Sequence, residues 1–302
     1  MKIRVLVCAS AAAAIGLVSV CVDSARSMEA AELRTATAAA YRAIARLIAR
    51  QGLPYPARVW NLIPGVLEPL GALPHRYMVF NAGRCDAYRQ WLRHPLNANR
   101  FPTASGVGHD GQDLVIHCLA SAQPVRPTEN PRQIPAYRYS QRHGPLPPCF
   151  SRATVMDHPF HDDSRWILIG GTASVVGEES IHGGRPDAQV HETFENLHAL
   201  LSSIMLEERY ERDPGGDPFR LLRDLRVYVV RHDDLQRIRE IVRSRVSLPE
   251  IEFVPADLCR PELLVEIEGV ALLDGRSDRT RVNHNGDASS RCTPRGSSSF
   301  AS

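Results

Sequence analysis

The stretch DLCRPELLVEIEGVALL, residues 257–273, carries the pattern that decides the fold. Glu266 and Glu268 interrupt an apolar run, and the two-residue period of a strand places both on one face, opposite Val265 and Ile267. One interpretation is an edge strand with a solvated face. The other is a buried strand, which the continuous apolar flanks favour. Burial and like charge would then raise the pKa of one glutamate, making it a general acid, while the other orients or stays charged.

Strands and helices alternate twice along the chain. Helical periodicity covers residues 28–50, 76–92, 185–210 and 232–246, and apolar strand patterns cover 57–66, 112–121, 164–177 and 225–231. This order predicts an α/β (α+β) protein with mixed β-sheets packed by helices. We expect an N-terminal subdomain over residues 28–155, a C-terminal subdomain over 156–273, and a disordered tail over 274–302, where the sequence is polar and without period.

The composition argues against several classes of protein. A net charge of +2, with no basic run interleaved with aromatic residues, gives no reason to expect a nucleic acid or a membrane as partner. The seven cysteines form no CxxC pair and are odd in number, which argues against a zinc site or a disulfide framework and fits a reduced compartment.

Residues 1–27, in contrast, have a pattern that suggests export. Lys2 and Arg4 precede an apolar run, as in a secretory signal peptide, but no small-x-small cleavage site follows, and Val20 stands before Cys21 where a lipoprotein signal has a small residue. Three interpretations stay open: an exported, lipoprotein-like binding domain, an incorrectly assigned start with translation from Met28, or a buried strand and helix.

The segment 125–154 is rich in proline and arginine and too long to be an ordinary loop. Its arginines alternate with tyrosines, which allows two interpretations. It is either a solvated basic loop or a clamp in which guanidinium groups bind the carboxylates of a small polycarboxylate and phenols bind its hydroxyls. The residues concerned are Arg132, Arg138, Arg142, Arg152, Tyr137 and Tyr139.

Other motifs give weaker signals. The stretch GGTASVVGEESIHGG, residues 170–184, has neither G-x-G-x-x-G nor G-K-[ST], so it favours a turn in which backbone closely approaches a strand or ligand over a nucleotide site. The histidines show no metal-ligand spacing, and no G-x-S-x-G follows a strand.

Six segments, in this order, resemble the chorismatase family, whose members were formerly described as pteridine-dependent dioxygenase-like. They are ARVWNLIPGV, RYMVFNAGRCDAYRQWL, ENPRQIPAYRYSQRHGPLPPCFSRAT, GGTASVVGEESIH, QVHETFENLHALL and LCRPELLVEIEGV. The resemblance implies a pseudo-trimeric, YjgF-like arrangement of mixed sheets. It also implies release of the enolpyruvyl group of chorismate as pyruvate, without metal or organic cofactor. Because chorismate is a cytoplasmic metabolite, we expect a cytoplasmic protein, and we expect a monomer.

The resemblance assigns roles to individual residues. Glu266 lies seven residues after Cys259, the spacing of the 3-hydroxybenzoate-forming type, and so corresponds to the catalytic acid. Arg152 matches a substrate-binding arginine, and His143 stands where the family has a tyrosine that binds substrate. The remaining substrate-binding residues expected are Arg138, Arg231, Tyr139, Cys259 and Glu268.

Three activities stay open after this comparison. The first is conversion of chorismate to 3-hydroxybenzoate and pyruvate, and the second is hydrolysis to a dihydroxycyclohexadiene carboxylate and pyruvate. The third is a degenerate, non-catalytic metabolite-binding protein. It is suggested by His143 and by the expectation that the β-rich stretch preceding the helix at residues 39–50 in the family is missing here.

Overall fold

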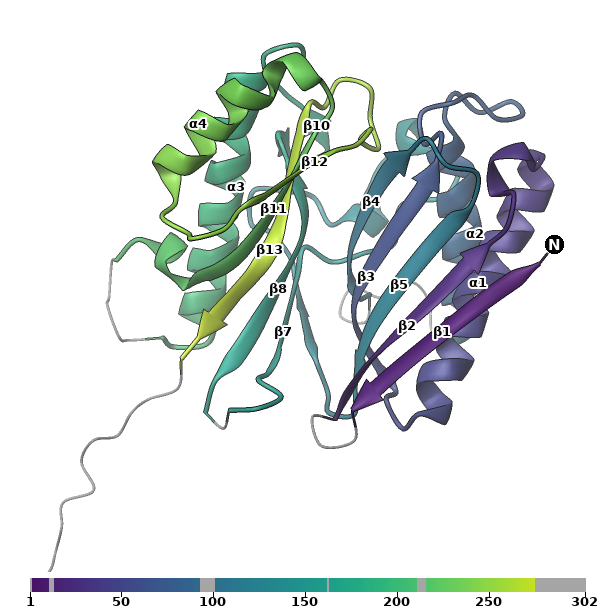
Figure 1. Ribbon diagram of the computed structural model, residues 1–302, viewed down its shortest axis with the longest axis horizontal. Coiled ribbons are helices and arrows are strands. Elements are labelled where there is room, and N and C mark those ends of the chain that lie inside the picture. The colour runs from purple at the N-terminus through teal and green to yellow at the C-terminus, as the bar shows by residue number, and fades with distance from the viewer. Residues whose placement is uncertain (1, 11–13, 93–100, 162, 211–215, 275–302) are drawn as a thin grey trace, which may run out of the picture.

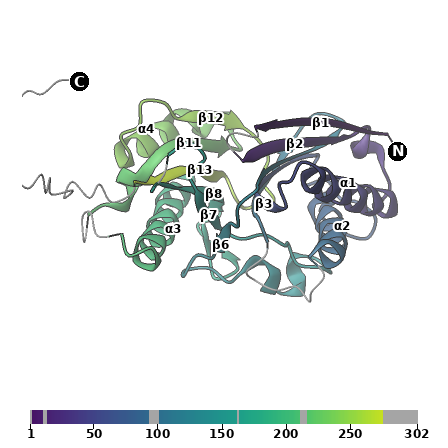
Figure 2. The same cartoon turned by 90° about the horizontal axis from the view of Figure 1, so that it is seen from below.

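The computed structural model describes residues 2–10, 14–92, 101–161, 163–210 and 216–274. These residues form two β-sheets that face each other, and each sheet is covered on its outer face by two helices (Figure 1). The view from below shows the same arrangement, with the helices at opposite sides of the molecule (Figure 2). The predicted fold class, mixed sheets packed by helices in two subdomains, is confirmed.

The N-terminal sheet has five strands in the order β1-β2-β5-β3-β4. All neighbours are antiparallel except β3 and β4, which are parallel. The elements are β1 (Ile3–Ser10), β2 (Ile15–Val22), α1 (Ala30–Arg50), β3 (Tyr55–Pro64), α2 (Arg76–Trp91), β4 (Thr103–His109) and β5 (Leu114–Ser121).

The C-terminal sheet has six strands in the order β12-β11-β13-β8-β7-β6, and its one parallel pair is β11 with β12. Its elements are β6 (Arg126–Thr128), β7 (Ala153–Asp157), β8 (Arg165–Ala173), α3 (Pro186–Glu207), β11 (Leu222–Val229), α4 (Leu235–Arg245), β12 (Glu252–Pro255) and β13 (Val265–Leu273). A small hairpin joins β9 (Val175–Val176) to β10 (Glu179–Ser180). Short 3-10 helices are η1 (Ala25–Ser27), η3 (Ala136–Arg138), η4 (Gln141–His143), η5 (Pro218–Leu221) and η6 (His232–Asp234).

The two halves have the same topology. In each, a hairpin leads to a helix, a strand, a second helix and two further strands, and the last strand inserts between the hairpin and the strand that follows the first helix. Thus β7, β8, β11, β12 and β13 correspond to β1, β2, β3, β4 and β5. The chain therefore contains one structural unit twice, with β6 added at the edge of the second copy.

The strand that carries the glutamate pair lies inside its sheet, between β11 and β8. Val265 and Ile267 pack into the core beneath α3 and α4, while Glu266 and Glu268 point toward the other sheet and are each only 4% exposed. The interpretation as an edge strand with a solvated face is therefore wrong, because both neighbours of β13 are paired and the N-terminal sheet covers its polar face.

Residues 3–10 and 15–22, from the segment whose pattern resembles a signal peptide, form the β1–β2 hairpin of the N-terminal sheet. Val18, Val20 and Val22 point from β2 into the core beneath α1, and β5 pairs along the whole of β2. The expectation that β-structure is missing before the first helix is therefore wrong, since two strands precede α1. The apolar run is accounted for by the two strands of this hairpin, of which β2 is the buried one.

The subdomain boundary expected at residue 155 divides β7. By strand pairing, the change of sheet comes between β5 and β6, after Ser121, because β6 and β7 both belong to the C-terminal sheet. The segment between β6 and β7 returns to the interface of the two sheets. Apart from Asp274, the tail expected to be disordered lies outside the described residues. None of the helices in the described ranges is both long and apolar enough to span a bilayer.

Close packing of α1 on α2 depends on Gly83. A Cβ atom at this position would lie 2.4 Å from the backbone oxygen of Arg34 and 2.8 Å from the Cβ atom of Thr37. We expect Gly83→Ala to lower the free energy of unfolding by about 1–3 kcal/mol, because the helices must separate. Urea denaturation checks this. Gly183→Ala, with no heavy atom nearer than 4.0 Å, is the control and should change stability by about 0.5 kcal/mol or less. Equal effects would contradict the close-packing argument.

Candidate active site

A cavity of about 320 Å³ lies where the two sheets meet. Its wall comes from α2, β4, β8, β13, the segment between β6 and β7, and the segment before β13. The lining residues with polar or aromatic side chains that bear on the chemistry are Tyr77, Arg84, Ser105, Tyr139, His143, Phe150, Arg152, Cys259, Arg260 and Glu266. Five of the eight residues predicted from the sequence therefore line one cavity.

Glu266 is the buried acid of this cavity. Its Oε1 atom has no hydrogen-bond partner among the described residues. Burial raises the pKa of Glu266 to about 8, with a further contribution from the charge of Glu268, while the charges of Arg58 and Arg152 oppose the increase. The side chain is therefore protonated at neutral pH, as a general acid must be.

The space for Glu266 comes from a β-bulge in β8. Gly170 and Gly171 together lie opposite Glu268, so the register shifts by one residue at this point. A Cβ atom on Gly171 would lie 2.0 Å from Oε1 of Glu266, and one on Gly170 would lie 3.0 Å from the backbone oxygen of Ala104. As expected, the glycine-rich stretch allows its backbone to approach other groups closely, here the Glu266 side chain and the backbone of Ala104.

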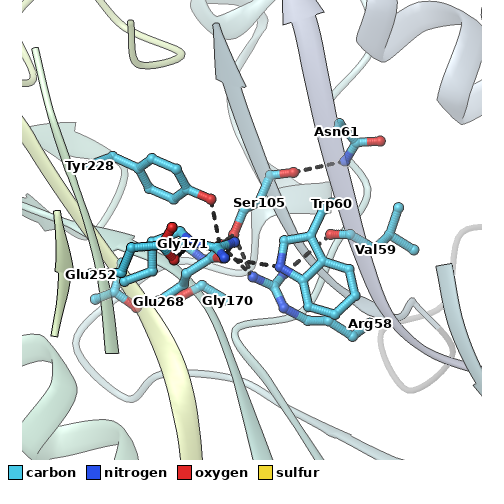
Figure 3. Close-up of polar contacts among 12 residues, drawn as sticks. Arg58, Val59, Trp60, Asn61, Ser105, Gly170, Gly171, Tyr228, Glu252 and Glu268 are labelled. Carbon is cyan, nitrogen blue, oxygen red and sulfur yellow. Dashed lines mark hydrogen bonds and ion pairs between the residues drawn. The ribbon is translucent and has the colours of Figure 1, made fainter. Parts of the chain in front are cut away.

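Glu268 does not line the cavity. Its Oε2 atom accepts a hydrogen bond from Nη2 of Arg58 at 2.8 Å, and the two side chains are 5% and 2% exposed (Figure 3). Other donors to the carboxylate are Trp60 at 3.0 Å, Tyr228 at 3.1 Å, Arg226 at 3.3 Å and the Ser105 hydroxyl. Two guanidinium groups and three further donors therefore surround the carboxylate, which contacts other elements of the protein rather than the cavity.

Two buried guanidinium groups face the cavity, and neither forms a salt bridge with a carboxylate in the described part of the chain, although the charge of Arg152 acts on the buried carboxyl group of Glu129. Arg152 donates to the hydroxyl of Tyr139 at 2.5 Å, and Arg84 donates to Oδ1 of Asn81 at 2.7 Å. Both lie near the ring of Phe150, whose centre is 5.0 Å from Cζ of Arg152 and 5.8 Å from Cζ of Arg84. Unpaired buried cations on one wall favour an anionic ligand.

Arg84 was not predicted from the sequence. It lies on α2, where the stretch 79–85 is buried on every side rather than along one stripe. An arginine inside such a stretch, FNAGRC, is the signal that could have identified it, because a buried arginine requires a partner or a ligand.

His143 and Cys259 complete the cavity wall. Nε2 of His143 is buried and has no hydrogen-bond partner among the described residues, and its ring lies 5.1 Å from that of Tyr139. Burial, and then the charge of Arg260, lower the pKa of His143, so the imidazole is neutral at pH 7. Burial and the charge of Glu266 raise the pKa of Cys259 to about 12, which leaves a neutral thiol.

Two predicted binding residues lie elsewhere. Arg138 is exposed, with its guanidinium 5.5 Å from the centre of the Tyr137 ring, and Arg231 is exposed at the start of η6. Neither lines the cavity. The family resemblance that suggested both residues does not determine which way a side chain points.

The arginine-rich segment contributes to the site in part. Arg152 reaches the cavity, whereas Arg132 turns toward α3 and pairs with Glu192 at 2.7 Å. At the rim, Glu178 accepts hydrogen bonds from the backbone N–H of Ser140 at 2.8 Å and from Arg142 at 3.0 Å. The carboxylate of Glu178 therefore fastens η4 to the β9–β10 hairpin at the mouth of the cavity.

Among the described residues, one cluster of metal-ligand type lies far from this site. It consists of Cys21, Asp23 and Asp113. The guanidinium of Arg4 donates to both carboxylates at 2.7 Å, so a cationic group already occupies the cluster.

Comparisons with known proteins identify similar sequences and a similar fold. Residues 7–120 match the family model for the N-terminal part of FkbO/Hyg5-like chorismatases. A 3-hydroxybenzoate synthase of Streptomyces hygroscopicus is 35% identical over 241 residues, which cover 78% of this chain and 69% of that protein. A chorismatase of Streptomyces rapamycinicus is 34% identical over 248 residues, covering 82% and 72%. A crystal structure of a chorismatase matches with a TM-score of 0.73 at 26% identity, covering 85% of this chain and 77% of that one.

The ion pair between Arg58 and Glu268 generates a prediction on stability. We expect Glu268→Ala to lower the free energy of unfolding by about 3–5 kcal/mol, because it leaves the guanidinium of Arg58 buried and unpaired. The matched control is Glu252→Ala, which removes the exposed partner of Arg226 at 2.6 Å and should cost about 0–1 kcal/mol. Urea denaturation of both variants measures the difference. Similar costs would show that the buried pair does not hold the sheets together.

Proposed function

The chain belongs to the chorismatase family, and from this premise we propose that it converts chorismate to 3-hydroxybenzoate and pyruvate. One observation carries the proposal. The buried, protonated Glu266 shares a cavity with the two buried guanidinium groups of Arg84 and Arg152. A proton donor beside two cations suits the protonation of a doubly anionic substrate.

Chorismate carries one carboxylate on its ring and one on its enolpyruvyl group. Arg84 and Arg152 both line the cavity near the Phe150 ring, so each guanidinium can bind one carboxylate. Binding both ends fixes the orientation of the substrate relative to Glu266, and such positioning contributes substantially to rate. His143 offers its unpartnered Nε2 atom to a ring hydroxyl, in place of the tyrosine of the family.

The chemistry begins with transfer of the proton of Glu266 to the methylene carbon of the enolpyruvyl group, which becomes the methyl group of pyruvate. The bond between the ring and the ether oxygen then breaks, and this oxygen becomes the keto oxygen of pyruvate. The neighbouring ring hydroxyl closes on the vacated carbon to give an epoxide, which opens to the phenol. The proton of the hydroxyl returns to the carboxylate of Glu266, so the sequence consumes neither acid nor water.

The hydrolytic alternative differs by one water molecule and gives a dihydroxycyclohexadiene carboxylate. Two observations favour the phenol. Cys259 has the spacing of the 3-hydroxybenzoate-forming type, and its neutral thiol lines the cavity. One relative covering 78% of the chain is a 3-hydroxybenzoate synthase. Liquid chromatography of the products separates the two outcomes. Because the proposed substrate is a cytoplasmic metabolite, we propose that the protein acts in the cytoplasm.

Replacing the acid tests the proposal. We expect Glu266→Gln to reduce pyruvate release by about 10²–10⁴-fold while chorismate still binds, because the amide keeps the shape of the side chain but cannot deliver the proton. A coupled pyruvate assay and calorimetric titration measure the two quantities. Glu250→Gln, the same substitution at an exposed position, should leave turnover unchanged. No pyruvate from the unmodified protein would refute the activity, and normal turnover by Glu266→Gln would refute the assignment of the acid.

The pH dependence of kcat provides a separate test. Since the pKa of Glu266 is raised to about 8, the acid is protonated below that pH, and kcat should be constant from about pH 6 to about pH 8. Above it, kcat should fall by about tenfold per unit as the proton is lost. An anionic substrate beside the acid moves the onset of this decline in kcat to a higher pH. A decline beginning between about pH 4 and pH 6, as for an ordinary glutamate, would contradict this assignment.

A further inference from the structure

A second buried carboxyl group, that of Glu129, lies beside the site and takes no part in the chemistry described above. Glu129 follows β6 directly. Both of its carboxylate oxygens are buried and have no hydrogen-bond partner in the described ranges. A buried carboxylate without hydrogen bonds is costly, so a nearby cation or a bound proton must stabilise it.

That cation is Arg152. The backbone N–H of Arg152 donates to the carbonyl oxygen of Thr128 at 3.0 Å, and Thr128 pairs with Ala153 across the β6–β7 ladder. The backbone therefore holds Glu129 next to Arg152. Nε of Arg152 is also buried without a hydrogen-bond partner among the described residues. Complementary polar atoms are thus left unsatisfied on two adjacent side chains.

The charged and titratable groups that act on Glu129 are Arg152, Arg138 and the phenol of Tyr137. Burial raises the pKa of Glu129 to about 7, and the charges of Arg152 and then Arg138 oppose the increase. Near neutral pH the group is therefore divided between its charged and its neutral form. A small change in the surrounding charge is sufficient to shift it.

We propose that Glu129 is the counter-ion of Arg152 in the empty cavity, and that it takes up a proton when an anionic ligand binds Arg152. The inference rests on the proposed function, because it requires a carboxylate to reach Arg152. A ligand carboxylate neutralises the guanidinium and adds negative charge near Glu129. Both effects favour its protonated form. Glu129 is thereby a positioning residue that acts through Arg152 and makes contact with no reacting atom.

The sign of the pH effect follows from this linkage. Since the pKa of Glu129 is higher in the complex than in the free protein, binding is strongest below about pH 7 and weakens as pH rises above it. The effect falls on Kd and KM and leaves kcat at saturation unchanged. The kcat profile set by Glu266 and the affinity profile set by Glu129 are therefore separable.

The experiment is calorimetric titration of chorismate into Glu266→Gln, which removes turnover and the other carboxyl that titrates in the cavity. Measurements at about pH 6, 7 and 8.5, in paired buffers of different ionisation enthalpy, give both Kd and proton uptake. We expect Kd to rise about 3–10-fold over this range, with uptake near pH 7–8. His143, whose pKa is lowered, stays neutral from about pH 7 upward.

Glu129→Gln in the same background should abolish the proton uptake and flatten the pH dependence of Kd, and Glu129→Asp should restore both. Glu240→Gln on the exposed face of α4 is the charge-matched control and should leave them unchanged. If Glu129→Gln does not fold, the proposal is tested by whether the Glu266→Gln protein takes up a proton when chorismate binds. Binding without proton uptake, or an unchanged profile in Glu129→Gln, overturns the role of Glu129. Absence of any chorismate binding refutes the proposed function instead.

Discussion

The buried ion pair between Arg58 and Glu268 is the contact on which the rest of the structure depends. It joins β3 of the first sheet to β13 of the second, across 210 residues of sequence. Because the carboxylate is also bound by Trp60, Tyr228 and Ser105, the two sheets are held in one relative position. The walls of the cavity come from both sheets, so its shape follows from this position. A buried pair of this kind is a weak source of net stability, but it defines a unique arrangement of the elements that it joins.

The same contact sets the chemistry of the neighbouring glutamate. Glu266 and Glu268 share one face of one strand, yet they occupy opposite electrostatic environments. Five side chains donate hydrogen bonds to Glu268, whereas Oε1 of Glu266 has no partner among the described residues. Burial of Glu266, and then the charge of Glu268, raise the pKa of Glu266 to about 8. Two identical side chains thus divide into a structural anion and a proton donor.

The sequence predicts those parts of the site that depend on local pattern. Alternation in β13 gave the shared face of the two glutamates, and family motifs gave Arg152, His143 and Cys259. Arg84 and Arg58 were not predicted. The stretch FNAGRC around Arg84 is a local signal, whereas the pairing of Arg58 depends on Glu268, 210 residues away. Arg138 was predicted from the arginine-rich segment and the family resemblance, and Arg231 from the resemblance alone. Both proved exposed, since a motif match does not determine which way a side chain points. The N-terminal segment left a signal segment and a buried strand both open, because the two share the same apolar composition.

The rim of the cavity has a consequence for ligand exchange. Because the interior ion pair joins the two halves, parting them to admit a small molecule would break a buried contact. The rim offers an easier route, because Glu178 fastens η4 there to the β9–β10 hairpin through exposed hydrogen bonds with Ser140 and Arg142. Entry and exit then depend on breaking a few solvent-accessible contacts of one short turn. Salt, or the substitution of a single side chain at the rim, can therefore change the rates of substrate binding and product release. The interior of the protein stays unchanged.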